Sequence, residues 1–358
     1  MSVLNQPATA DARWPAGERS AAIRELRSLT WLPVAAMTAL LVLTLAAPAA
    51  AAAVAVPVAV VGALLGIPHG AVDHLVPWWW RPIELPGSGT RVQSTQRHRR
   101  GLGLFAIGYA AFAALALAGL LLFPTPMIAA FLLLSAAHFG RGEVVTSAER
   151  AGRRTPGLRQ EWPVASAYGL VVVGLLLWSS PLSTDPFLRP LSAWLADAVL
   201  RSRGPGLVVV AVAVVVGLGL LLRSRRHLEA GELMLLSVTF ATAPPLAAFG
   251  VYFGCWHALR HTGRLLDLAE RQRSRAGLSK GLVQGLSKGL SEGGWAPAVG
   301  LVARASIGPT LIAIGVVGAL WWARDLASLQ AEVAVLLALT FPHAAVVWAL
   351  DRRQARQR

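Results

Sequence analysis

The stretch FGVYFGCWHALRHTGR, Phe249–Arg264, sets His257 and His261 four residues apart within an apolar run that is compatible with a helix. On an α-helix, this spacing stacks two imidazoles on one face, one turn apart, where both can reach a single ion. Such a pair can also be hydrogen-bonded core or a pair of haem ligands. Titratable groups in a membrane-length apolar segment are costly, so they indicate a functional site. Three further histidines lie in similar settings: His69, His138 and His343.

The composition is that of a polytopic membrane protein. Of the 358 residues, 55% are hydrophobic and 14% are charged, and the mean hydropathy is +0.56, which is too apolar for a soluble domain of this length. The net charge of +15 comes from basic residues in short connections between apolar runs, where they act as topology signals. We therefore exclude nucleic acid as a partner and expect a lipid bilayer. The lone Cys255 allows no intrachain disulfide and is more typical of packing than of chemistry.

About ten apolar runs divide the chain, most of them close to the roughly 20 residues that a bilayer core requires. They predict an all-α fold, a polytopic transmembrane helical bundle of about 8–10 membrane helices. Pro244 and Pro245 force a kink or a reversal, because consecutive prolines remove two backbone donors and disfavour helix before them. The runs lie near residues 29–47, 53–75, 102–122, 127–143, 163–180, 206–222, 232–243, 246–264, 305–322 and 332–350.

The basic connections decide between a kink and a reversal. A single crossing by residues 232–264 would place the basic segment 264–304 and the C-terminal tail outside, against the positive-inside rule. We therefore predict a reversal at Pro244–Pro245. The protein is then a multi-pass protein of the cell (inner or plasma) membrane with both termini in the cytoplasm. The inside connections are 81–101, 141–160, 223–231 and 264–304.

The remaining segments complete the predicted organisation. A polar cytoplasmic tail, residues 1–28, precedes a single membrane domain, residues 29–350, and a basic tail, residues 351–358, follows it. The connection at 277–294, GLSKGLVQGLSKGLSEGG, repeats Gly-Leu every four residues. So many glycines disfavour a helix, and we expect a flexible loop near the membrane surface.

The predicted topology brings the histidines of the apolar runs together. The second, fourth, eighth and tenth runs all pass from outside to inside, and each carries its histidine or histidine pair in its inner portion. Five imidazoles thus reach one depth, which indicates a shared site. Asp73 lies one turn after His69 and can accept the second ring N–H of a metal-bound histidine, or be solvated at the inner interface. Glu143 follows His138 and can act in the same way or cap the helix.

Four local patterns follow one another along residues 55–350: GIPHGAVD at 66–73, AHFGRGE at 137–143, YFGCWHALRH at 252–261 and FPHAAVVW at 341–348. Together they resemble the Brp/Blh family of integral-membrane bacterial and archaeal β-carotene 15,15′-dioxygenases, which make retinal. The combination is specific, although each pattern alone is weak. Three features depart from the family: the N-terminal leader with the first span, Glu143 where aspartate is familiar, and Trp348 where some members carry aspartate.

The resemblance implies an enzyme in which Fe(II) activates O₂ and β-carotene is cleaved at its central double bond to two molecules of all-trans-retinal. No catalytic residues are implied beyond the metal ligands, which by position are His69, His138, His257 and His261. We expect His343, Asp73 and Glu143 to lie next to these ligands without binding the metal themselves. A fifth strong ligand would leave a six-coordinate iron only one open position.

Two other classes of protein use histidines in this way. Membrane di-iron hydroxylases and desaturases also carry His-x-x-x-His pairs at the inner face, but they use more histidines and an HxxHH pattern that this chain lacks. A non-enzymatic membrane protein can hold haem between paired helical histidines or use them along an ion path. An absorbance spectrum separates these alternatives, because haem gives an intense Soret band and a mononuclear ferrous site is nearly colourless.

Overall fold

The computed structural model describes residues 16–78, 91–153, 156–157, 161–265, 306–308, 310–311, 315 and 329–357. Its regular structure is helical, without a strand among these residues, which confirms the predicted all-α fold. The expected flexible loop at 277–294 lies outside the described residues, as does most of the expected span at 305–322. Helix α1 begins at Ala16, so it extends into the segment that the sequence assigned to the polar tail.

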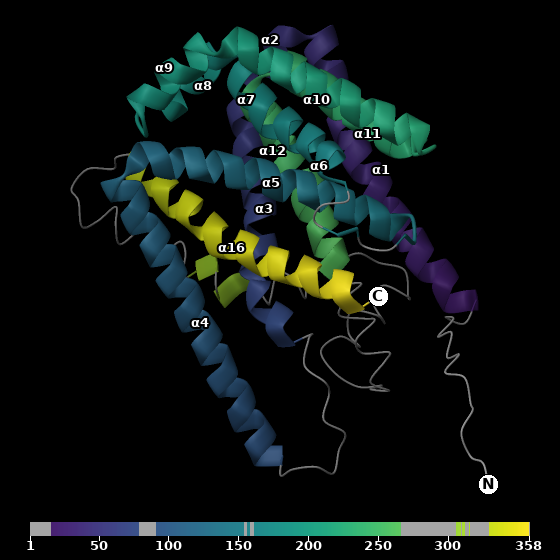
Figure 1. Ribbon diagram of the computed structural model, residues 1–358, viewed down its shortest axis with the longest axis vertical. Coiled ribbons are helices and arrows are strands. Elements are labelled where there is room, and N and C mark those ends of the chain that lie inside the picture. Colours follow the sequence, from purple (N-terminus) through teal and green to yellow (C-terminus); the bar gives the residue numbers. More distant parts are fainter. Residues whose placement is uncertain are drawn as a thin grey trace.

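Figure 1 shows the helices, several of which are short or broken. The 3₁₀ segment is η1, and the two π-helical segments are η2 and η3. The elements in chain order are α1 (Ala16–Ala46), α2 (Pro48–Ala53), α3 (Ala55–Ala71), η1 (Asp73–Trp78), α4 (Arg91–Leu122), α5 (Pro124–Arg150), α6 (Trp162–Gly169), η2 (Leu170–Gly174), α7 (Leu175–Trp178), α8 (Pro181–Leu188), α9 (Ala193–Arg201), α10 (Arg203–Arg223), α11 (His227–Thr242), α12 (Pro245–Val251), η3 (Tyr252–Ala258) and α16 (Leu329–Gln357).

Four of the described helices are long and apolar enough to cross a membrane: α4, α5, α10 and α16. The run from α6 to α7 meets α8 at an angle of 87°, and this bent pair is a fifth candidate. Two shorter apolar helices, Trp31–Ala46 and Ala55–Ala71, correspond to the first two expected spans. The described residues therefore hold fewer full-length spans than hydropathy predicts, because hydropathy does not register where prolines and bends break a run.

The chain reverses at Pro244–Pro245, as predicted. Helix α11 ends at Thr242, Ala243 is extended, and α12 begins at Pro245. The side chains of Glu232, before the break, and Arg260, after it, form an ion pair of 2.8 Å, so the two segments return alongside each other. The prolines cause the break, because they supply no backbone N–H to continue the helix of the preceding residues.

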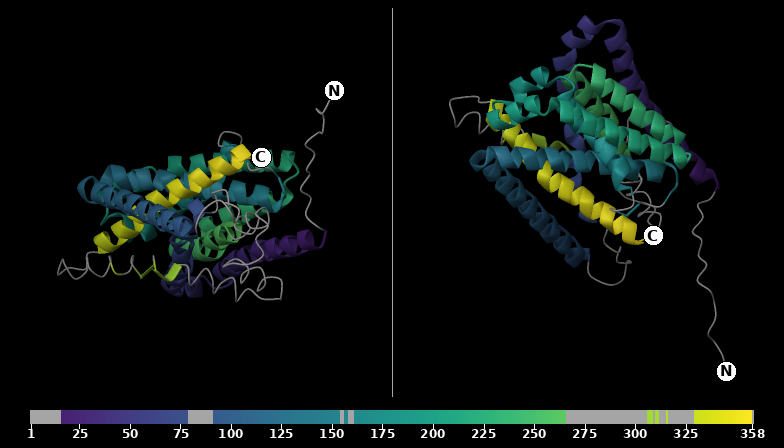
Figure 2. Two further views of the ribbon diagram at one scale, coloured as in Figure 1. Left: turned by 90° about the horizontal axis from the view of Figure 1, so that it is seen from below. Right: turned by 45° about the horizontal axis from the view of Figure 1, so that its top comes forward.

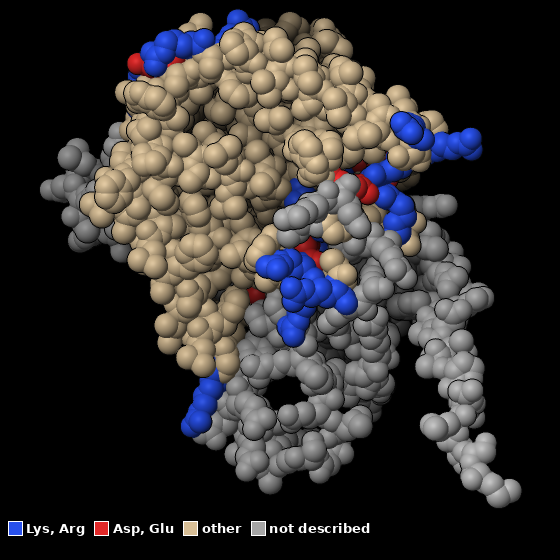
Figure 3. Space-filling model, in the orientation of Figure 1, with Lys and Arg blue, Asp and Glu red and all other residues tan. Residues whose placement is uncertain are grey.

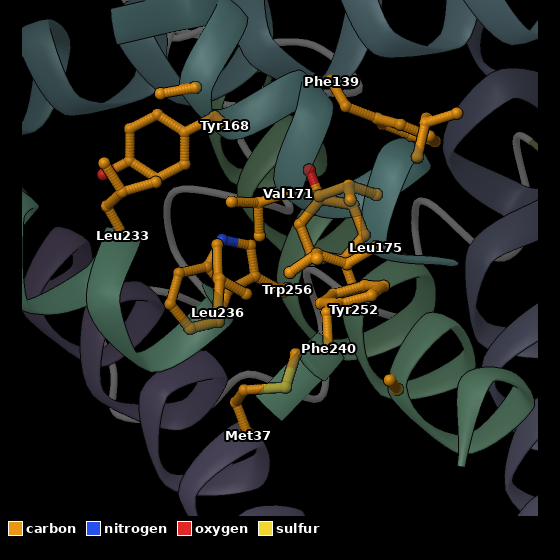
Figure 4. Close-up of a cluster of buried hydrophobic side chains, with 14 of the residues drawn as sticks. Met37, Phe139, Tyr168, Val171, Leu175, Leu233, Leu236, Phe240, Tyr252 and Trp256 are labelled. Carbon is orange, nitrogen blue, oxygen red and sulfur yellow. The ribbon is translucent and has the colours of Figure 1, made fainter. Parts of the chain in front are cut away.

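The main apolar core is formed by side chains of α1, α5, α6, η2, α10, α11, α12 and η3, and Figure 4 shows part of it. Its largest members are buried aromatic side chains, Tyr168, Tyr252, Trp256 and Phe240. Two of these belong to η3, so the segment that carries the histidine pair is anchored in the core on one side. On another side, helices α4, α5 and α16 lie next to one another (Figures 1 and 2).

Glycines allow helix α3 to approach α12 and η3 closely. A Cβ atom at Gly62 would lie 2.1 Å from the carbonyl oxygen of Gly250, and one at Gly254 would lie 2.6 Å from the carbonyl oxygen of Gly62. Side chains cannot occupy these positions without separating the backbones. Because α3 carries His69 and η3 carries His257, this contact sets the distance between two histidines.

The surface matches a lipid environment. Figure 3 shows a broad face without charge, with acidic and basic side chains gathered at its margins. Apolar side chains point outward along the long helices, for example Leu104 and Leu115 of α4 and Val215 of α10. Such a continuous apolar surface is typical of a helical membrane protein.

Candidate metal centre

Five histidine rings meet between the helices. The shortest distance between ring centroids is 4.8 Å, for His69 and His343, and the longest of the ring contacts is 6.2 Å, for His257 and His261. His138 is partly buried and the other four are buried. The rings come from α3 (His69), α5 (His138), η3 (His257), the helical residues 259–265 (His261) and α16 (His343).

The nitrogens of this cluster are close enough to share an ion. Ligand atoms of His69, His257 and His343 all lie within 4.8 Å of one another. The Nε2 atoms of His138 and His257 are 3.2 Å apart. Two nitrogens bound at right angles to one ion, each at about 2.1 Å, would be separated by about 3 Å. The observed separation therefore fits two ligands of one metal.

Two buried ring nitrogens support the same assignment. The Nε2 atoms of His261 and His343 have no hydrogen-bond partner in the described part of the chain. A buried nitrogen without a partner is costly, and a metal ion would satisfy it. Because all the donors are imidazoles, the set suits a transition metal such as iron and does not suit magnesium or calcium, which prefer oxygen. The residues present thus fit a transition-metal site.

The histidine pair follows a π-helical segment rather than an unbroken α-helix. Residues Tyr252–Ala258 are π-helical, and His257 lies within this turn while His261 lies just beyond it. The two rings are stacked nearly parallel, at an interplanar angle of 9°. π-Helical turns occur often at functional sites, because they change the direction of one turn of side chains. The pattern of apolar residues did not predict this turn.

Asp73 contacts a different histidine from the one predicted. Its Oδ2 lies 2.8 Å from Nδ1 of His343 and accepts a hydrogen bond of 3.1 Å from the Tyr109 hydroxyl. The ring of His69 instead contacts the carbonyl oxygen of Gly66 through Nδ1. The reason is local: α3 ends at Ala71 and the 3₁₀ segment begins at Asp73, so an α-helical register no longer relates Asp73 to His69.

Glu143 binds the segment that carries the histidine pair. The buried carboxylate accepts hydrogen bonds from the Tyr252 hydroxyl at 3.2 Å, from Nε1 of Trp256 at 3.0 Å and from Nη1 of Arg260 at 2.8 Å. Arg260 also pairs with Glu232 of α11. The two predicted roles of Glu143, a histidine acceptor and a helix cap, do not include these contacts. Glu143 instead joins α5 to η3.

A second buried ion-pair group follows on the same segment. Arg264 pairs with Glu149 of α5 at 3.0 Å and with Asp351 of α16 at 2.5 Å, and it also contacts Gln354. Asp351 in turn accepts from Arg141 at 3.3 Å. Three of the histidine-bearing segments, α5, the helix of His261 and α16, are therefore joined by ion pairs as well as by packing.

Sequence reasoning missed Tyr109, Arg260 and Glu232. The sequence could have indicated a role for Arg260, because this residue is charged and lies between two histidines in an apolar run. Such a charge needs a buried partner. Glu232 had a similar signal near the start of the run 232–243. Tyr109 had none, since a tyrosine in an apolar helix is common.

The fold and the cluster define a helical membrane protein with a candidate transition-metal centre formed by imidazoles. The chain belongs to the beta-carotene 15,15'-dioxygenase family, whose family model matches residues 60–351. The match contains all five clustered histidines and begins after α2, so the N-terminal helix lies outside it. A relative in Halobacterium salinarum, described as a probable beta-carotene 15,15'-dioxygenase Blh, is 29% identical over an aligned length of 318 residues; the alignment covers 81% of this chain and 82% of the relative. No solved structure matches the chain.

Proposed function

We propose that this protein cleaves β-carotene with O₂ at the central 15,15′ double bond and releases two molecules of all-trans-retinal. The observation that carries the proposal is the convergence of five histidines, from four separate sequence motifs, within the region matched by the family model. The family assignment favours a dioxygenase over the di-iron and non-enzymatic alternatives that the sequence raised.

The reaction balances without a further reductant. The C15–C15′ double bond and the O–O bond break, and two carbonyl double bonds form, so that each aldehyde receives one oxygen atom. Protons are neither consumed nor released. The chemistry that a ferrous ion supplies when bound is the activation of O₂.

We propose that Fe(II) is held by His69, His138, His257 and His261. Neutral imidazoles suit ferrous iron, and the 3.2 Å separation of the His138 and His257 nitrogens supports a common ion. The buried carboxylates keep the ligand-bearing helices in place: Glu143 holds η3, and Asp351 holds the helix of His261 through Arg264. The identity of the ion is part of this proposal.

Aromatic side chains surround the histidines and keep water away from them. Phe253 packs edge-on against His69 at 5.5 Å, and Phe139 packs edge-on against His257 at 4.9 Å. Phe249 and Phe253 are stacked at 5.7 Å. We propose that these rings form the wall along which the polyene lies, since its own surface is entirely apolar. The substrate would enter from the bilayer. Both termini of the protein would lie in the cytoplasm.

Production of the protein in a bacterial host that accumulates β-carotene tests the proposal. We expect loss of orange colour and formation of all-trans-retinal. In ¹⁸O₂, with immediate reduction of the aldehydes to prevent exchange with water, both product molecules should carry label. His74→Ala is a suitable control, because His74 contacts the carbonyl oxygen of Ala71 and lies outside the cluster. Absence of retinal from iron-loaded protein that has folded in the membrane would refute the proposal, and a Soret band would favour the haem alternative.

A further inference from the structure

We infer that His343 is a fifth imidazole ligand of the metal and that Asp73 and Tyr109 are positioning residues that hold it there. The inference rests on the proposed metal centre and adds residues to it. It also departs from the expectation that His343 lies beside the ligands.

The contact with Asp73 determines which nitrogen of His343 carries the proton. A carboxylate accepts hydrogen bonds, so Nδ1 of His343 donates to Oδ2 of Asp73 across 2.8 Å. Nε2 then bears the lone pair. Hydrogen bonding of one ring nitrogen to a carboxylate is the usual way in which a metal-bound histidine is oriented and made more basic.

The free nitrogen of His343 belongs to a ring that lies among the other histidines. It is buried and has no hydrogen-bond partner in the described residues. The ring contacts those of His69, His138 and His261, at 4.8, 5.1 and 5.6 Å. One of its ring nitrogens also lies within 4.8 Å of a ring nitrogen of His69 and of a ring nitrogen of His257. His343 is therefore placed at least as well as the expected ligands.

Asp73 and Tyr109 form a chain of hydrogen bonds that ends on the His343 ring. Asp73 is 2% exposed, and a buried carboxylate in an apolar segment is costly unless it is paired. Its Oδ2 is shared between the His343 ring and the Tyr109 hydroxyl, which links η1 and α4 to α16.

Five imidazoles still leave one position for O₂. A haem iron with four porphyrin nitrogens and one histidine binds O₂ at its single remaining position. The objection raised from the sequence, that a fifth ligand would leave too few positions, therefore does not exclude His343.

Metal titration of purified variants tests the inference without reference to activity. Fe(II) or Co(II) alone is added in competition with a chelator, and the Co(II) absorption spectrum records the ligand set. The variants are His343→Ala, Asp73→Asn and Tyr109→Phe. We expect His343→Ala to lower metal affinity by at least about 10–100-fold, to change the Co(II) spectrum, and to regain both in part when imidazole is added. Asp73→Asn should weaken binding by about 10–100-fold and Tyr109→Phe by a smaller factor.

Tyr168→Phe is the matched control. It also removes a buried hydroxyl, but that hydroxyl donates to the carbonyl oxygen of Glu229 at 2.7 Å, so metal affinity should not change. Wild-type affinity and an unaltered Co(II) spectrum in folded His343→Ala would overturn the inference while leaving the proposed function intact. If the wild-type protein bound neither metal, the proposed metal centre itself would fail.

Discussion

Replacing Glu143 with leucine should destabilise the protein through the charge that it leaves behind. In the native state, two carboxylates (Glu143 and Glu232) and two guanidinium groups (Arg150 and Arg260) form one buried group of zero net charge. Loss of Glu143 leaves a net charge of +1 and removes the acceptor from two aromatic donors. Breaking a buried ion pair costs about 3–5 kcal/mol, and each orphaned donor adds about 1–3 kcal/mol. We therefore expect a loss of at least about 3 kcal/mol.

The double variant Glu143→Leu/Arg260→Met provides the critical comparison. It restores zero net charge, because Glu232 and Arg150 still pair at 2.7 Å. Apolar replacement of a buried ion pair is often close to neutral, so the double variant should be more stable than the single one. Thermal unfolding in detergent, followed by tryptophan fluorescence, measures both. If the single variant unfolds at the wild-type temperature, or if the double variant is less stable than the single one, the charge argument is wrong.

Four further predictions concern the metal, the helix contact and the topology. His257→Ala and His261→Ala should each abolish retinal formation and reduce bound iron while the protein still inserts; near-normal activity in either would remove that residue from the site. Chelation of the metal should abolish activity reversibly and lower thermal stability, since a ligand at 100 times its Kd contributes about 2.7 kcal/mol; an unchanged melting temperature would contradict a metal bound in the folded state. Gly62→Leu should separate α3 from α12 and lose metal binding, whereas Gly103→Leu, with no atom within 4 Å of its Cβ position, should keep it. A reporter that is active only in the periplasm should stay silent when fused after Arg358, and a strong signal would overturn the predicted orientation.

The convergence of the histidines was predictable because two independent patterns in the sequence constrain it. Hydropathy divides the chain into helices, and the basic connections assign their directions, so that His69, His138 and His343 reach the same depth. The reversal at Pro244–Pro245 followed from the same reasoning, and the ion pair between Glu232 and Arg260 confirms it. That these side chains bind iron stays a proposal.

The hydrogen-bond partners were not predictable, because they depend on where helices end and on how they rotate. Asp73 was paired with His69 by α-helical spacing, but α3 ends between them and the 3₁₀ segment turns Asp73 toward His343. The length of the helices was also missed. Hydropathy averages over a run and does not report the 87° bend before α8 or the π-helical turn of η3.

The alternation of histidines and arginines explains how one helix can present its proposed metal ligands in a fixed direction. His257 and His261 are four residues apart, and so are Arg260 and Arg264. The two arginines therefore lie on a side of the helix next to the side that carries the histidines. Rotation of the helix that moved the histidines away from the other three imidazoles would also draw the arginines out of their buried ion pairs. The carboxylates of α5, α11 and α16 therefore fix the rotation of the helix, and the two imidazoles are held in the direction that a shared ion requires.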